Sequence, residues 1–254
     1  MTTTIKKLAF YLALMATPLF FFTSCDDDDN NDNDEVSVFL AFENVVDGTD
    51  IQAGQTYDID GRNITFDIVN YYISNVRIMD DNGNMVVSSD DVFLAKEGNA
   101  NSFEIGTVQD DAHAHMVMFT LGIQDTAVNL GDPSQYTSEQ ALSTTQNMHW
   151  SWNSGYIFLK LEGQVDTTAT PDGQLDDSFI YHLGTDNLKR EVSVMAHGDI
   201  DSDNNTITLN FDLATALQNV TFSNSGEMVS HTMNNMPTAI TIMDDADDAF
   251  SKAN

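Results

Sequence analysis

The chain has 254 residues, with 40 Asp and Glu against 9 Lys and Arg, which gives a formal net charge of -31 at pH 7. Nucleic acids and anionic lipid headgroups are bound mainly through Lys and Arg, so this charge argues against either as a partner. The hydrophobic fraction of 41% is enough for one packed core. A single cysteine excludes an intramolecular disulfide and any Cys-based zinc or redox motif.

The first residues have the pattern of an export signal. Lys6 and Lys7 precede an almost continuous apolar run, residues 8–22, which is short for a membrane-spanning helix. The run ends in Phe22-Thr23-Ser24-Cys25, which resembles a bacterial lipobox. We therefore expect residues 1–24 to be a lipoprotein signal peptide and Cys25 to be lipidated. The alternative is an ordinary cleaved signal with an incidental cysteine.

An acidic segment follows the cysteine. Residues 26–35 contain only Asp, Asn and Glu, so they bury no apolar surface, repel one another and predict an extended, hydrated tether. Acidic residues at this position resemble the surface-export tag of Bacteroidota lipoproteins; the alternative is a spacer on the periplasmic leaflet. Either interpretation predicts an outer-membrane lipoprotein that meets the membrane only through its lipid anchor and faces the periplasm or the cell surface.

Residues 36–254 are expected to form one β domain. Apolar and polar residues alternate over short runs separated by Gly, Asn and Asp, which is the pattern of half-buried strands. Asp80-Asp81-Asn82-Gly83 is a tight-turn signal, and 132–147 and 213–219 are typical of helical or irregular structure. We predict an all-β fold, an antiparallel β-sandwich with short helical or irregular insertions. The predicted strands are Val36–Phe42, Asn63–Asp67, Tyr71–Met79, Asn84–Val87, Ser102–Val108, His115–Leu121, Tyr156–Gly163, Ser178–Leu183, Glu191–Ala196 and Thr206–Phe211.

Both tryptophans of the chain, Trp150 and Trp152, lie in the segment Met148–Tyr156. Two apart in a strand, they would share one face and fill the core. The second interpretation is a copper site, because Met148 and His149 are adjacent to them. Imidazole binds copper in either oxidation state, whereas thioether and indole favour the cuprous ion. The segment alone leaves both interpretations open.

The chain has six histidines, with no HxxxH or HExxH spacing, which argues against a hydrolytic zinc site of that kind. His113 and His115 would share one face of an extended segment, either as a two-nitrogen metal clamp or as the solvated start of a strand. His182 lies at the end of an apolar strand, a setting typical of a hydrogen-bonded core histidine. His231 has a polar, loop-like setting.

The run Asp199 to Asn204 has an acid at every second position, as in a calcium loop. Because it lacks the Gly and the final Glu of an EF-hand, it predicts either a weak calcium site or an acidic hairpin turn. The run Asp172 to Asp177 has the same ambiguity. No GxSxG motif is present, and the many carboxylates make acid pairs for glycoside hydrolysis uninformative.

Several segments resemble the MbnP-like domain family, which includes copper-binding partner proteins of methanobactin operons and related Bacteroidota lipoproteins. The two longest are Tyr71–Arg77 and Met148–Gly163. Shorter similarities occur in family order along the chain, so that the resemblance extends over about residues 36–250. These are Phe119–Ile123, Phe179–Gly184 and Ile242–Phe250.

The resemblance implies copper binding by an extracytoplasmic β domain, in which a tryptophan oxidised to kynurenine joins histidines as a ligand. A MauG-like dihaem peroxidase is the implied oxidant. On this chain the matching positions are Trp150 or Trp152 for oxidation, with His149, His182 and His231 as imidazole ligands. Opening the indole ring exposes an aryl amine and a carbonyl, which provide lone pairs that an intact indole lacks.

The chain differs from some relatives because no histidine precedes His113, so a ligand from the N-terminal strands is missing. We expect a copper-binding protein that is not itself an enzyme. One alternative is a non-metal surface interaction or accessory lipoprotein of nutrient uptake, with both tryptophans in the core. The other is an enzyme that acts on polysaccharide.

Overall fold

The computed structural model describes residues 35–97, 101–150, 155–168, 170–223 and 225–253, which belong to a unit spanning Asn33–Asn254. Cys25, Trp152, the signal segment and most of the acidic tether lie outside the described residues. The strands are β1 Glu35–Val46, β2 Thr49–Asp50, β3 Tyr57–Ile59, β4 Arg62–Met79, β5 Met85–Ser89, β6 Phe93–Lys96, β7 Asn101–Gln109, β8 Ala112–Leu121, β9 Leu159–Val165, β10 Asp177–Leu183, β11 Arg190–Ile200, β12 Thr206–Asp212, β13 Val229–Ser230 and β14 Phe250–Lys252.

The helices of the described residues are short. They are α1 Thr126–Asn129, α2 Leu213–Ala216, α3 Met236–Asp247 and the 3-10 turns η1 Pro133–Gln135, η2 Thr144–Gln146 and η3 Asp186–Leu188. Helix α3 packs against α2, β10, β11 and β13. None of these helices is long and apolar enough to cross a bilayer.

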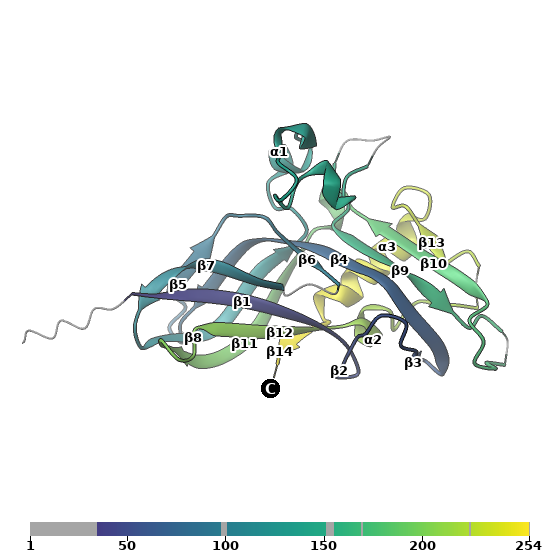
Figure 1. Ribbon diagram of the computed structural model, residues 1–254, viewed down its shortest axis with the longest axis horizontal. Helices are drawn as coiled ribbons and strands as arrows, with labels where there is room; N and C mark the ends of the chain where they lie inside the picture. Colours follow the sequence, from purple (N-terminus) through teal and green to yellow (C-terminus); the bar gives the residue numbers. More distant parts are fainter. Residues whose placement is uncertain (1–34, 98–100, 151–154, 169, 224, 254) are drawn as a thin grey trace, which may run out of the picture. The chain divides into compact units, whose positions relative to one another are not determined.

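The strands form two sheets in the described part of the chain. One sheet has the order β14-β12-β1-β2, with β7 also paired to β1. The other has the order β11-β8-β4-β9-β10-β13, and β3, β5 and β6 pair with the long strand β4. Figure 1 shows β1 beside β12 in one layer and β4 beside β9 in the other. Most pairings are antiparallel, but β1 with β12 and β10 with β13 are parallel.

An aromatic core joins the sheets. The ring centroid of Phe42 on β1 lies 6.1 Å from that of Tyr71 on β4 and 5.6 Å from that of Phe119 on β8, and both pairs pack edge to face. Tyr71 in turn lies 5.0 Å from Phe211 of β12, and Phe119 lies 5.1 Å from Phe250 of β14. All five side chains are buried, and aromatic pairs of this geometry stabilise a core beyond the area that they bury. The predicted all-β sandwich is confirmed.

The predicted elements differ from the observed ones in several places. The segments Asn63–Asp67 and Tyr71–Met79 are one strand, β4, whose pairings shift register at three places that interrupt the simple alternation. Strand β6 and helix α3 were not predicted; the helix begins with Pro237 near its start, a position where proline is favoured. The predicted strand Tyr156–Gly163 begins later, at Leu159.

Gly163 permits the close approach of β9 to β4, and we expect Gly163→Ala to be strongly destabilising. A Cβ at this position would lie 1.9 Å from the backbone oxygen of Thr65 and 2.7 Å from the ring of Phe179. Overpacking of this kind costs about 1–3 kcal/mol in free energy of unfolding, and a backbone clash places the variant at the upper end. Urea denaturation measures the effect.

Gly198→Ala is the matched control, because its Cβ would meet nothing nearer than 3.6 Å in a strand of the same sheet. We expect this control to change the free energy of unfolding by less than about 0.5 kcal/mol. Equal stability of the two variants would show that β4 and β9 can move apart at no cost.

Candidate metal centre

Two histidines from neighbouring strands face each other. Strands β10 and β13 pair in parallel with Tyr181 opposite Ser230, so the next residues, His182 and His231, emerge side by side. The Nδ1 atoms of the two imidazoles are 3.2 Å apart, and the ring centroids are 4.8 Å apart. We call these two residues the histidine pair.

Glu162 fixes the orientation of His182. The strand β9 lies on the other side of β10, and Glu162 Oε1 is 2.6 Å from His182 Nε2. Burial, with only 15% of the side chain exposed, lowers the pKa of His182 against the opposing effect of the Glu162 contact, which favours the neutral imidazole. A neutral ring that donates Nε2–H to the carboxylate has its Nδ1 lone pair directed at His231. This carboxylate–histidine arrangement is the usual support of a metal-binding imidazole.

Trp150 lies against the histidine pair. Its ring centroid is 6.0 Å from that of His182 and 6.4 Å from that of His231. The side chain is only 5% exposed and belongs to a small apolar cluster that also contains Met148, Tyr156 and Phe158. Trp150 therefore fills a core and also borders the imidazoles, so the two interpretations of this segment are compatible.

His149 is placed away from the pair. It forms an isolated bridge with Tyr156, and its ring packs edge to face on that of Tyr156 at 4.9 Å. Successive side chains of an extended segment point to opposite sides, so when Trp150 faces the pair, His149 faces the other way. The structure thus brings together Trp150, His182 and His231 from the predicted ligand set, and not His149. Trp152 lies outside the described residues.

Gly184 lets the segment that carries Trp150 pass over the end of β10. A Cβ at Gly184 would lie 2.2 Å from the backbone oxygen of Tyr156 and 2.9 Å from Phe158 N. The absence of a side chain allows Phe158 N to donate to Leu183 O at 2.6 Å. This hydrogen bond fixes the tryptophan segment at the strand end that carries His182.

Thr232 joins the third segment to the same point. Its hydroxyl accepts from Gly184 N at 3.0 Å and donates to His182 O at 3.0 Å. Thr232 is buried and has a positive φ of 61°, which is unfavourable for a β-branched residue. Such strain persists only where the surroundings enforce it, and here it orients the adjacent His231.

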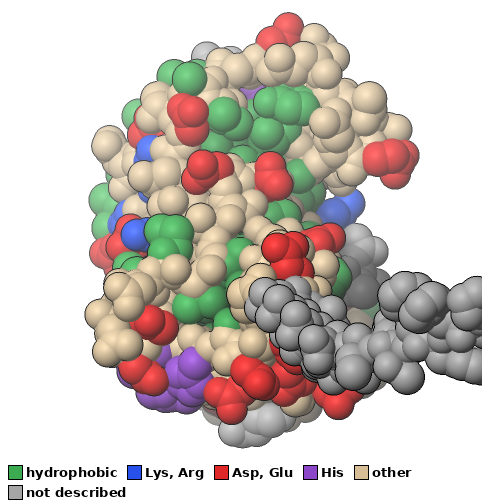
Figure 2. Space-filling model, turned by 90° about the vertical axis from the view of Figure 1, so that its left-hand side faces the viewer, with side chains coloured by type: hydrophobic (Ala, Val, Ile, Leu, Met, Phe, Trp, Pro, Cys, Tyr) green, Lys and Arg blue, Asp and Glu red, His purple; other side chains and the backbone are tan. Residues whose placement is uncertain are grey.

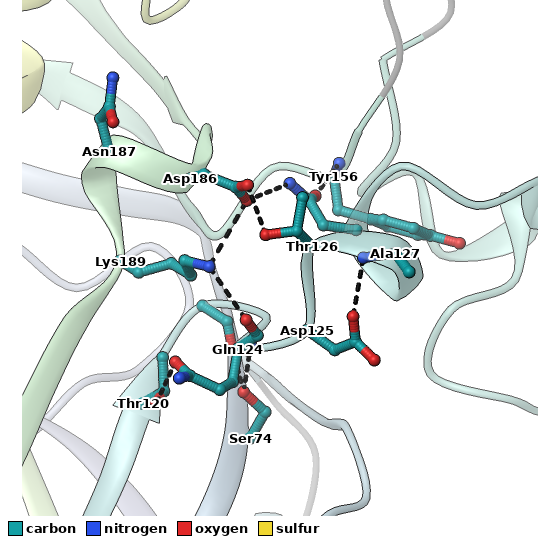
Figure 3. Close-up of polar contacts among 12 residues, drawn as sticks. Ser74, Thr120, Gln124, Asp125, Thr126, Ala127, Tyr156, Asp186, Asn187 and Lys189 are labelled. Atoms are coloured by element: carbon teal, nitrogen blue, oxygen red, sulfur yellow. Dashed lines mark hydrogen bonds and ion pairs between the residues drawn. The ribbon is translucent and has the colours of Figure 1, made fainter.

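A polar network supports the chain entering this crossing. The side-chain oxygen of buried Asn129 accepts from Tyr156 N at 3.0 Å, and its Nδ2 donates to Asp186 at 3.0 Å. Asp186 also accepts from Thr126 Oγ1 at 2.6 Å and lies 3.6 Å from Lys189 Nζ (Figure 3). Because Asp186 follows β10 closely, this network ties the tryptophan segment to the histidine strand a second time.

The donor set fits a transition ion. Two nitrogen ligands of one ion, at bonds of about 2.0–2.1 Å and a tetrahedral angle, lie roughly 3.3 Å apart, close to the separation of the two Nδ1 atoms. Imidazole nitrogens bind copper and zinc and not calcium or magnesium, which require oxygen. The separation of the histidine pair is therefore compatible with one shared transition ion, which would replace the hydrogen bond between the two Nδ1 atoms.

Glu162 and Thr232 were not identified from the sequence. The alternation Leu159-Lys160-Leu161-Glu162 does place Lys160 and Glu162 on the polar face of β9, which is a detectable signal for Glu162. No sequence pattern marks Thr232, because its role depends on a parallel pairing with a strand of two residues.

The calcium-like run folds as an acidic turn between the sheets and not as the predicted hairpin, because β11 and β12 belong to different sheets. Asp201 Oδ1 accepts from the backbone N–H groups of Asp203 and Asn204, both at 2.8 Å, and Asp199 is turned to His113. The carboxylates of this run are therefore used in separate interactions and do not converge.

A second acidic group, Asp166, Asp172 and Asp176, has oxygens within 4.8 Å of one another. Its central carboxylate is already satisfied: Asp166 accepts from Thr168 N and Oγ1 through one oxygen and from Asp172 N and Gly173 N through the other. These hydrogen bonds, that of Thr168 first, lower the pKa of Asp166 to about 2. The group acts as the organising centre of its loop.

This fold and geometry define a class: a two-sheet β-sandwich with a histidine pair beside a buried tryptophan. The MbnP family model matches residues 35–236, and the chain belongs to the MbnP family. A solved structure, MbnP from Methylosinus trichosporium, has the same fold with a TM-score of 0.51 and 16% identity, over 73% of this chain and 78% of that chain. A search of curated proteins finds no match. The family resemblance drawn from the sequence is confirmed.

We expect Thr232→Val to destabilise the centre. The substitution keeps the shape of the side chain but leaves Gly184 N–H and His182 C=O without their partner, which costs about 1–3 kcal/mol in free energy of unfolding. Urea denaturation measures the loss, and the ring resonances of His182 and His231 should move in NMR spectra. Thr232→Ser, which retains the hydroxyl, is expected to keep most of the stability; if Val and Ser behaved alike, the hydroxyl would have no structural role.

Asp166 gives a pH prediction. Its pKa in the folded chain, about 2, is below the ordinary value of 3.8, so its contribution to stability is complete above about pH 4 and is lost as the pH falls toward 2. We expect Asp166→Asn to be less stable than the wild type at neutral pH, with the difference shrinking through this window. Urea unfolding curves of the two proteins between pH 2 and pH 7 measure this; a difference in free energy of unfolding that stays constant down to pH 2 would contradict the role of the Asp166 carboxylate.

Proposed function

We propose that this MbnP-family protein is an extracytoplasmic copper-binding lipoprotein whose site is formed by His182 and His231, with Trp150 as the residue that is oxidised to kynurenine. The single observation that carries the proposal is the position of Trp150 against two imidazoles whose Nδ1 atoms face each other. The Nδ1 lone pairs would hold the ion, and Glu162 would hold the proton on Nε2 of His182.

The proposed oxidation of Trp150 requires an external oxidant. A MauG-like dihaem peroxidase would use two molecules of hydrogen peroxide. One oxygen atom of each would be inserted across the C2–C3 bond of the indole, which breaks, and the other would leave as water. Hydrolysis of the resulting formyl amide would release formate and leave an aryl amine and a ketone. Trp150 provides the ring at the required place; the peroxidase is a partner, so the chain itself needs no catalytic residue.

The lipobox-like segment that ends in Cys25 and the acidic run after it support lipidation of Cys25 and placement on the outer membrane, facing the periplasm or the cell surface. In this proposal the anchor is the only contact with the bilayer. The strong negative charge of the chain suits a cation-binding role, since it raises the local concentration of metal ions near the surface.

The test is co-expression of the full chain with the peroxidase, followed by intact-mass measurement, peptide mapping and titration with cuprous ion against a chromophoric chelator. We expect the mass change of a kynurenine on the peptide that contains Trp150, and tight copper binding by the oxidised protein. Trp150→Phe should lose both, whereas Trp152→Phe should retain both. Unchanged mass together with no tight copper would reject the proposal.

Ligand variants test the geometry separately. His182→Ala and His231→Ala should each abolish tight copper binding, and His149→Ala should leave it intact, because His149 lies on the other side of its segment. Glu162→Gln, which acts through His182, should weaken copper binding by about 10–100-fold. Glu43→Gln, the same change on an exposed residue of the other sheet, controls for charge. Loss of copper in His149→Ala alone would contradict the assignment of the pair.

A second candidate function is a non-metal interaction or accessory protein of nutrient uptake. The burial of Trp150 in an apolar cluster is the observation that favours it. In that case Trp150→Phe would change the free energy of unfolding. Neither the wild type nor the variant would contain metal, and co-expression with the peroxidase would not change the mass of either.

A further inference from the structure

Three histidines and two aspartates gather at the other edge of the larger sheet, away from the histidine pair. His113 and His115 lie on β8, His197 and Asp199 lie on β11, and Asp81 lies in the turn between β4 and β5. In the sheet order β11-β8-β4-β9-β10-β13, this group is at one edge, whereas His182 is on β10 near the other. Figure 2 shows histidine side chains gathered at one end of the face, among acidic side chains.

Strand geometry brings the imidazoles together. His113 and His115 point to one side of β8, while Ala114 between them is buried in the core. The pairing of β8 with β11 shifts between Met195 and Gly198, and this irregularity places His197 over the same side. The ring centroids of His115 and His197 are 4.3 Å apart, edge to face.

Asp81 is the common neighbour of the three rings. Its oxygens lie 3.3 Å from His113 Nε2, 2.6 Å from His115 Nδ1 and 3.9 Å from His197 Nδ1. Three of these residues can each direct one ligand atom to a common point: the ligand atoms of Asp81, His113 and His197 lie within 4.8 Å of one another. His115 Nδ1 is covered from solvent, yet its short contact with Asp81 lacks hydrogen-bond alignment.

Asp199 sets the tautomer of His113. Its Oδ1 is 2.7 Å from His113 Nδ1, so a neutral ring donates Nδ1–H to Asp199 and directs the Nε2 lone pair at Asp81. In the metal-free chain a proton on Nε2 satisfies this contact of 3.3 Å, since the hydrogen bond to Asp199, with the charge of Asp81 nearby, raises the pKa of His113; a bound metal ion would take the place of that proton. This separation is close to the roughly 3.4 Å expected for a nitrogen and an oxygen bound to one tetrahedral ion.

We propose that Asp81, His113 and His197, together with His115, form a second metal site, for a divalent transition ion of the zinc or cupric class. Imidazole nitrogens with one carboxylate are the ligands of such ions, whereas calcium and magnesium require oxygen throughout. Asp199 is the supporting carboxylate of the site, as Glu162 is at the histidine pair. This site needs no tryptophan oxidation and is independent of the proposed copper function.

The test uses Zn²⁺ and the full chain, produced without a histidine tag and without a peroxidase, so that the tryptophans stay intact. Zn²⁺ is titrated against a chromophoric chelator in high salt with excess Ca²⁺, which occupies the other carboxylates. We expect the double variant that carries His113→Gln and His197→Gln to bind one Zn²⁺ fewer per chain than the wild type. The variant His182→Gln with His231→Gln should retain that equivalent.

The Asp199→Asn variant distinguishes a specific metal site from the general attraction of cations to an acidic surface. Loss of this supporting carboxylate should weaken Zn²⁺ binding by about 10–100-fold. Asp203→Asn removes the same charge from an exposed position in the loop that follows β11 and should leave the affinity within about twofold of the wild type. Equal weakening in the two variants, or full Zn²⁺ binding in the double histidine variant, would overturn the proposal. Thermal unfolding of the metal-free proteins confirms that each variant is folded.

Discussion

The candidate centre depends on the close approach of two backbones at Gly184. With no Cβ at this residue, the residues Tyr156–Phe158 cross the end of β10 at hydrogen-bond distance, and Thr232 links the crossing to the chain that follows β13. Three parts of the sequence therefore meet at one point: those of Trp150, His182 and His231. A side chain at Gly184 would separate them, because its nearest neighbours are backbone atoms that have little freedom to move.

The sheet then supplies the electrostatic environment of the pair. Burial lowers the pKa of His182, which favours the neutral form of the ring, the form that can bind a metal ion. Glu162, on the adjacent strand, accepts the other ring proton and fixes the ring plane. Because both groups lie on paired strands, their positions are set by strand register, which is more rigid than a loop would be.

The sequence predicts the sandwich well because each strand carries its own alternation of apolar and polar residues. It predicts the contacts of the centre less well. His182 and His231 are 49 residues apart, and they meet through a parallel pairing with β13, whose two residues leave no detectable period. The side on which His149 lies depends on a single bridge to Tyr156. His197 reaches His113 because of a register shift that alternation does not reveal.

The two groups of histidines differ in a way that bears on which ion each would bind. At the histidine pair, the nearby carboxylate, Glu162, is occupied by the far nitrogen of His182, so the inner donors are neutral nitrogens beside an aromatic ring. At the other edge, the carboxylate of Asp81 points at the imidazoles themselves, which adds a negative oxygen to the donors. Neutral, soft surroundings with few ligands stabilise the cuprous ion, whereas an added carboxylate stabilises a divalent ion. In both groups a carboxylate accepts a hydrogen bond from an imidazole ligand. The two edges of a single sheet would thus bind metal ions of different charge.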